Sequence, residues 1–119
     1  MRRDLAVYLV DIQQCLDELA LFSSGKQLSD YRTDVLLRRA IERDFTIIGE
    51  VMRRILHHFP ETKVRIEDAQ AIADFRNVIV HEYNMLDDAK IWNILIHSAP
   101  VLKRQIDEWI SELDEASQP

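Results

Sequence analysis

Chain-breaking residues are scarce in this sequence, and this scarcity restricts the possible folds more than any other feature. Only two glycines and three prolines occur among 119 residues. β-Sandwiches, barrels and glycine-rich phosphate loops need more turn residues than this. The composition, 47% hydrophobic and 30% charged, is typical of a folded domain rather than a disordered chain. We therefore expect long helices joined by short loops.

Apolar residues recur at helical spacing in four long stretches of the chain. The first, third and fourth stretches cover approximately residues 4–22, 66–83 and 86–113, and the second begins after Asp30, or at Thr33, and continues to about residue 59. Short connections between long helices favour antiparallel neighbours. The sequence thus predicts an all-α antiparallel bundle of four to five helices. We expect a single domain over residues 1–113, with a frayed tail at residues 114–119.

The few glycines and prolines predict where these helices end or approach one another. Gly25 can cap the first helix, and Pro60 ends the second and begins a short polar connection. Pro100 predicts a kink or a break in the fourth helix, with Ser98 capping its second half. Gly49 lies inside a helix, where glycine costs about 1 kcal/mol relative to alanine. We expect it to mark the close approach of another backbone.

Charge and cysteine content exclude several classes of protein. With 15 basic and 21 acidic residues, the net charge of −6 argues against binding to nucleic acid by bulk charge alone. A local basic strip on the second helix is compatible with it, formed by Arg38, Arg39, Arg43, Arg53 and Arg54. The single cysteine, Cys15, allows no intrachain disulfide and no cysteine-based zinc site. No apolar run approaches the ~20 residues of a membrane span, so we expect a cytoplasmic protein without a membrane partner.

The third predicted helix carries an unusual concentration of polar side chains. At about 100° per residue, Arg76 and Tyr83 fall close together, and Asn77 and His81 lie further round the helix. Asn77 and His81 are four positions apart, so the amide can orient the imidazole. We expect the arginine, asparagine, histidine and tyrosine to share one accessible face. The apolar residues of this helix fall on the opposite side: Ile72, Phe75 and Ile79.

The run Arg76-Asn77-Val78-Ile79-Val80-His81-Glu82-Tyr83 resembles the Arg-x4-His-x-Tyr motif of HepT-like toxins in the HEPN superfamily. Residues 38–50, with their Arg-Ala-Ile-Glu and Ile-Gly-Glu pieces, are similar to the second helix of that family. The resemblance covers essentially the whole chain. One difference is that residues 60–66 lack the tryptophan found before the third helix in many relatives.

The resemblance implies a toxin that cleaves RNA without a metal or other cofactor, at a cleft between two copies of the chain. It implies that Arg76 and His81 are catalytic, with Asn77 and Glu50 as supporting residues. These residue types suit the reaction. Histidine, with an ordinary pKa of about 6.5, can accept or donate a proton near neutrality, and arginine stays charged beside a phosphate. One histidine in the motif of each chain favours a homodimer, because the reaction needs both an acid and a base.

The resemblance also implies a second role, that of Tyr83 as the acceptor of AMP. A minimal nucleotidyltransferase antitoxin would transfer the AMP and so block RNA binding. An alternative is a non-catalytic helical module that serves such a nucleotidyltransferase as scaffold or substrate. Structural readings also stay open: Arg76 as a salt-bridge partner of Glu50 or Asp74, and Tyr83 as an aromatic residue at the bundle edge. His97 is expected to be a partly buried residue of the bundle, and Trp92 and Trp109 are expected to be core or dimer contacts.

Overall fold

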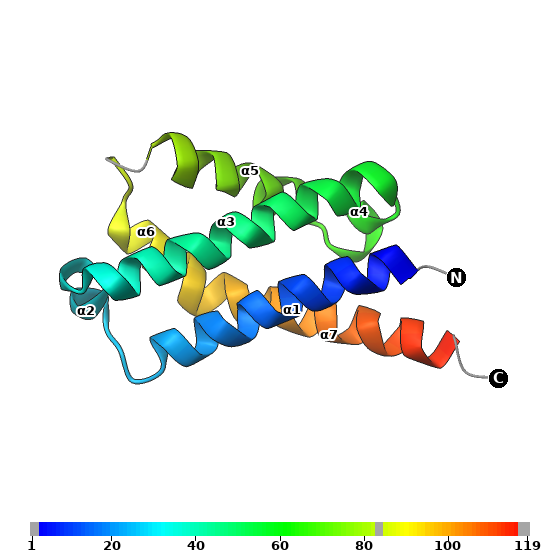
Figure 1. Ribbon diagram of the computed structural model, residues 1–119, viewed down its shortest axis with the longest axis horizontal. Helices are drawn as coiled ribbons and strands as arrows, with labels where there is room; N and C mark the ends of the chain where they lie inside the picture. Colours follow the sequence, from blue (N-terminus) through cyan, green and yellow to red (C-terminus); the bar gives the residue numbers. More distant parts are fainter. Residues whose placement is uncertain (1–2, 83–84, 117–119) are drawn as a thin grey trace.

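The computed structural model describes residues 3–82 and 85–116, and every regular element in this part of the chain is a helix. The all-α prediction is therefore confirmed. Figure 1 shows the central helix α3 (Val35–His58) with α5 (Ala69–His81) along one side and α1 (Arg3–Ser23) and α7 (Ala99–Ala116) along the other. Successive long helices run in opposite directions, as the short connections predict.

The apolar stripes of the four long helices meet in one core. Burying a large aliphatic side chain contributes about 1.5–3 kcal/mol, so the stripes account for most of the attraction between the helices. Among the described residues, no helix has both the length and the apolar content to cross a bilayer. The most deeply buried core residues include Leu5, Leu9, Ile12, Leu19, Ile41, Met52, Ile55 and Ile106.

The first helix ends as predicted. Gly25 has φ of +73°, the left-handed conformation that residues with a side chain rarely adopt. Two residues earlier, the Ser23 hydroxyl donates a hydrogen bond of 2.8 Å to the Leu19 carbonyl, one turn back in α1. Together these two residues end α1 and turn the chain toward the next helix.

The second predicted stretch is divided into two helices. A short helix, α2 (Leu28–Thr33), precedes α3, and Asp34 separates them. The Asp34 carboxylate accepts a hydrogen bond of 3.1 Å from the backbone N–H of Leu37, so this residue caps α3. Tyr31 in α2 is completely buried, and its ring lies 5.8 Å from that of Trp92. This packing holds α2 against the fourth stretch of the chain.

The connection after Pro60 is not the simple polar loop that the sequence predicts. It contains a one-turn helix, α4 (Thr62–Arg65), and Thr62 is completely buried. The Thr62 hydroxyl donates to the Phe59 carbonyl at 2.6 Å, which satisfies the buried hydroxyl. The Arg65 guanidinium lies 5.2 Å above the ring of Trp109, which is buried in α7. α4 is thereby held against the end of the bundle.

The fourth stretch is also divided, but its path stays helical through Pro100. A short helix, α6 (Asp88–Asn93), continues into a π-helical turn, η1 (Ile94–Ser98), and then into α7. The Ala99 N–H donates to the Ile94 carbonyl five residues earlier, and this wider turn takes the chain into the proline. The expected break with a Ser98 cap is therefore wrong.

Two other expectations for this stretch differ from the structure. His97 is exposed rather than partly buried. The helix α7 extends to Ala116, beyond the predicted end at Leu113. Trp109, by contrast, is buried in the core as expected, and Trp92 is half-buried against it.

Candidate functional site

The closest approach of two helices in the candidate site is at Gly49. A Cβ atom built at this position would lie 2.5 Å from the Arg76 Cβ and 3.2 Å from both the Arg76 backbone nitrogen and the Ile72 carbonyl oxygen. Such short contacts leave no room for a side chain, so the prediction that another backbone lies close to Gly49 is confirmed. That backbone is the segment of α5 that carries Arg76. Gly49 therefore determines where the Arg76 side chain leaves α5.

Arg76 does not lie on the same side of α5 as Asn77 and His81, which the helical spacing had predicted to share its face. Its Cβ faces α3, and its side chain is 34% exposed. Asn77 and His81 are exposed. The small side chain of the buried Ala73, one turn earlier, leaves room for the apolar stem of the arginine. The guanidinium thus emerges at the edge of the contact between α3 and α5.

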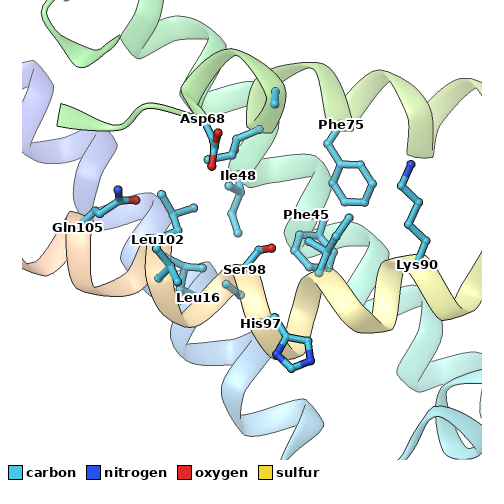
Figure 2. A pocket seen from close by; sticks show the side chains of 15 residues that line it. Leu16, Phe45, Ile48, Asp68, Phe75, Lys90, His97, Ser98, Leu102 and Gln105 are labelled. Carbon is cyan, nitrogen blue, oxygen red and sulfur yellow. The ribbon is translucent and has the colours of Figure 1, made fainter. Parts of the chain in front are cut away.

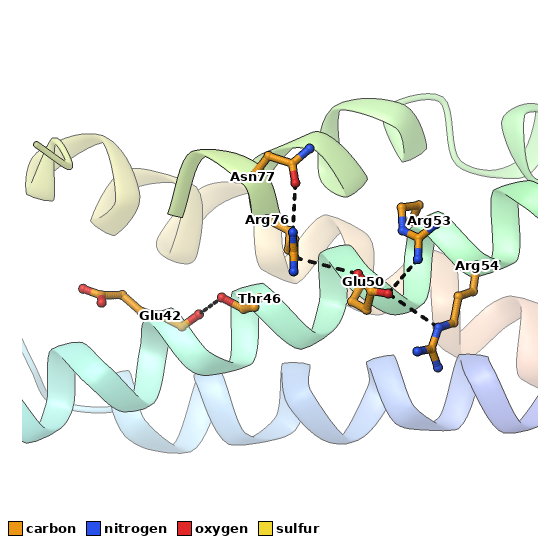
Figure 3. Close-up of polar contacts among 7 residues, drawn as sticks. All are labelled: Glu42, Thr46, Glu50, Arg53, Arg54, Arg76 and Asn77. Carbon is orange, nitrogen blue, oxygen red and sulfur yellow. Dashed lines mark hydrogen bonds and ion pairs between the residues drawn. The ribbon is translucent and has the colours of Figure 1, made fainter. Parts of the chain in front are cut away.

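One carboxylate, that of Glu50, connects three arginines around this edge (Figure 3). Its Oε1 accepts a hydrogen bond of 2.8 Å from Arg53 Nη2 and lies 3.6 Å from Arg54 Nε. Its Oε2 lies 3.8 Å from Arg76 Nε. The predicted proximity of Glu50 to Arg76 is present. The roles of Arg53 and Arg54 beside it were missed, although their spacing of three and four residues from Glu50 was a usable signal.

The Arg76 guanidinium is held on two sides but keeps an unsatisfied donor. Its Nη1 donates to the Asn77 side-chain oxygen at 3.1 Å. Its Nε is buried and has no hydrogen-bond partner among the described residues, because the Glu50 oxygen is too distant for one. The Asn77 side chain thus contacts Arg76, and among residues 3–82 and 85–116 no hydrogen bond joins the side chains of Asn77 and His81.

The arginines hold the pKa of Glu50 below its ordinary value, first through the hydrogen bond from Arg53 and then through the charges of Arg53, Arg76 and Arg54. Because the pKa of Glu50 is lower in the folded than in the unfolded protein, its ion pairs stabilise the fold fully above the ordinary pKa of glutamate. This stabilisation is lost as the pH falls through the lowered value. Carboxyl NMR shifts of Glu50 should therefore titrate below those of a free glutamate. Arg53→Ala should raise this midpoint more than Arg54→Ala does. A wild-type midpoint at the ordinary value would contradict the described pairing.

His81 is the last residue of α5 and is exposed. The Glu82 N–H donates to the Val78 carbonyl at 3.0 Å and closes the final turn. His81 and Arg76 are about 7.5 Å apart along the helix axis and about 140° apart around it. They therefore flank the exposed end of α5 rather than touch. Tyr83 lies outside the described residues.

A mainly apolar cavity of about 450 Å³ lies beside another side of α5 (Figure 2). Phe45 and Phe75 line it, with their rings edge to face at 5.4 Å, and Lys90 and His97 are among its few polar residues. Arg76, Asn77, His81 and Glu50 do not line it. The candidate site is therefore the surface edge between α3 and α5, not this cavity.

Three of the five arginines in the predicted basic strip on α3 pair with acidic residues of the same helix. Arg39 pairs with Glu42 at 2.9 Å, and both Arg53 and Arg54 pair with Glu50. The strip is therefore interrupted by ion pairs and is not a uniform positive surface. Positive charge is concentrated where three arginines share one carboxylate.

Comparison with known proteins finds similarity over most of the chain. Residues 12–109 match the family model of HepT-like ribonucleases. The chain is 30% identical over 101 residues to a candidate RNase of Caldanaerobacter subterraneus subsp. tengcongensis, which covers 85% of this chain and 89% of that protein. It is 24% identical over 106 residues to a candidate RNase of Methanocaldococcus jannaschii, covering 89% and 96% of the two chains.

A protein of Thermococcus cleftensis named as a candidate ribonuclease HepT is 25% identical over 108 residues, covering 91% of this chain and 97% of that protein. No solved structure matches the chain. The family match extends over most of the chain and includes both the α3 segment with Gly49 and Glu50 and the α5 segment with Arg76 and His81. The chain therefore belongs to the family of HepT-like ribonucleases.

Proposed function

We propose that this chain is the toxin of a toxin–antitoxin pair and cleaves RNA through Arg76 and His81 without a metal ion. The observation that carries the proposal is the state of Arg76. Its guanidinium is held by the Gly49 contact and the Asn77 hydrogen bond, and its side chain is 34% exposed. The exposed part of this fixed cation can donate to a phosphodiester oxygen at the edge of α5.

The proposed reaction is a transesterification within the RNA backbone. A histidine removes the proton of the ribose 2′-hydroxyl, whose oxygen attacks the adjacent phosphorus, and the bond to the 5′-oxygen breaks. A second group acts as an acid and donates a proton to that leaving oxygen, so that protons and charges balance. Arg76 stabilises the added negative charge on the phosphorane oxygens. Asn77 and Glu50 act as positioning residues for its guanidinium.

The acid and the base come from two copies of the chain in this proposal. His81 is the one histidine of the α5 motif, and it is exposed at the helix end, where a second subunit can approach. A two-fold axis beside this end would place two Arg76–His81 sets around one cleft. One histidine then acts as base and the other as acid.

Cleavage by purified protein tests the proposal, with His81→Ala compared against wild type in the presence of a chelator. Loss of cleavage and of toxicity on expression is expected, because no other group at the α5 edge can replace the imidazole. His57→Ala is the matched control, since His57 is also exposed but lies in α3. If folded His81→Ala cleaves RNA as fast as wild type, His81 is not catalytic. If wild type itself does not cleave RNA and is not toxic, the chain is instead the non-catalytic module.

The antitoxin in this proposal is a minimal nucleotidyltransferase that transfers AMP to Tyr83. An adenylate two residues beyond His81 would bring a phosphate charge and a bulky base to the place where RNA binds. Mass spectrometry after co-expression with such an enzyme should detect one AMP on Tyr83. Tyr83→Phe should remain unmodified and toxic despite the partner. Modification only at another residue would contradict this mechanism of control.

A further inference from the structure

A second group of chemically active side chains lies on the other side of α3, between α3 and α1. Cys15 and Glu18 are three residues apart in α1, and Asp44 faces them from α3. The Cys15 sulfur and one carboxylate oxygen from each acidic residue all lie within 4.8 Å of one another. Cys15 is 5% exposed and Asp44 is 3% exposed, whereas Glu18 lies at the surface.

Asp44 carries an unsatisfied oxygen at this place. Its Oδ2 is buried and has no hydrogen-bond partner among the described residues. Asp44, Cys15 and Glu18 all line one cavity of about 410 Å³. Leaving a buried carboxylate oxygen without a partner costs about 1–3 kcal/mol or more, so such an atom calls for a ligand. The cavity gives a ligand space to enter.

We propose that Cys15, Glu18 and Asp44 form a binding site for a single divalent zinc-like cation. A thiolate with two carboxylates is a donor set that Zn²⁺ accepts, and Mg²⁺ and Ca²⁺ take oxygen donors instead. A single cysteine excludes zinc sites made of several thiolates, but not a mixed site of this kind. Water from the cavity would occupy the fourth position of a tetrahedron.

The geometry fits the cation after a small contraction. Zinc bonds of about 2.3 Å to sulfur and about 2.1 Å to oxygen place tetrahedral donors about 3.6 Å apart. The three donors, now within 4.8 Å, would need to close by about an ångström at most. Glu18 can supply this movement because its side chain is exposed. Asp44 and Cys15 are fixed by burial.

The charges around the group also favour a cation. The bound form would combine a thiolate and two carboxylates with the divalent ion, leaving one negative charge, and Arg43 lines the same cavity. In the metal-free protein, burial, together with the neighbouring Asp44, raises the pKa of the Cys15 thiol to about 12. The ion must displace this proton, so binding would be accompanied by proton release. Asp44 and Glu50 lie about 9 Å apart along α3, so the ion would link α1 to α3 and take no part in cleavage.

Titration with Co²⁺ alone, as a coloured substitute for Zn²⁺, tests the proposal on the full chain. We expect one equivalent to bind with a thiolate-to-cobalt charge-transfer absorption and to be displaced by Zn²⁺. Cys15→Ser should abolish this absorption. Glu18→Gln should weaken binding by about tenfold or more, and its exposed position should leave the fold intact. Gln14→Ala is the matched control, because Gln14 lines the cavity, carries no charge and lies outside the three-residue cluster, so its change should leave binding unaltered.

Two results would overturn the assignment. The first is the absence of any thiolate-to-cobalt absorption in folded protein with excess Co²⁺. The second is binding that is equally strong in wild type, Cys15→Ser and Glu18→Gln. Neither result depends on RNA cleavage, so the metal site and the proposed nuclease can fail independently.

Discussion

Arg76→Ala is expected to lower RNA cleavage by about 10²–10³-fold, because it removes a fixed donor to the charge that develops on the phosphorane. Arg76→Lys should recover only part of this loss. Lysine keeps the positive charge but lacks the planar pair of donors that matches two phosphate oxygens. Single-turnover cleavage of a model RNA, measured for both variants at saturating protein, separates this effect from weaker binding.

The Arg76 variants should stay folded, since alanine keeps the Cβ that contacts Gly49. Thermal unfolding provides the check. Arg53→Ala is the matched control, because Arg53 is bound to the same Glu50 but is 64% exposed and belongs to α3. Its loss should affect RNA affinity more than the chemical step. If Arg76→Ala cleaves as fast as wild type while folded, Arg76 is a structural ion-pair partner only.

Gly49→Ala is expected to destabilise the protein and to reduce cleavage together. The new methyl group would lie 2.5 Å from the Arg76 Cβ, so α5 must move away from α3. Overpacking of this kind costs about 1–3 kcal/mol, of which the better helix propensity of alanine returns about 1 kcal/mol. A shift of α5 by about an ångström can also cost about 10²-fold in rate, because it displaces Arg76. Chemical denaturation and RNA cleavage measure the two effects.

The other glycine provides the matched control for this substitution. Gly25→Ala should also destabilise, by about 1 kcal/mol, because alanine is strained in the left-handed conformation. No atom lies within 4 Å of a Cβ built there, so α5 is not displaced and cleavage should be unchanged. If Gly49→Ala lowers stability and leaves cleavage intact, the helix spacing does not set the position of Arg76.

The four long helices were predictable because each has an apolar stripe long enough to define its period. The close contact at Gly49 was predictable as well. A glycine inside a helix lowers the stability of the helix, and the close packing of a second helix can offset this loss. The short elements were not. α2 and α4 are each shorter than two turns, and their burial depends on Tyr31 and Thr62 contacting segments distant in the sequence.

The orientation of Arg76 could not be derived from residue type. A helical wheel assigns arginine to the solvent side, but here the apolar stem of Arg76 packs over a glycine, and only the guanidinium reaches the surface. Asn77 and His81 were correctly expected on an exposed side. The path through Pro100 was also not predictable, since a π-helical turn before a proline has no clear sequence signal.

The shared carboxylate of Glu50 has a consequence for how the surface receives an anion. Three guanidinium groups already converge on one acidic side chain, so their mutual repulsion is offset before any substrate arrives. An incoming phosphodiester therefore does not have to bring separate arginines together. It displaces the Glu50 carboxylate, which carries charge of the same sign. This competition keeps the three arginines together in the absence of RNA and weakens their hold on an RNA strand after cleavage.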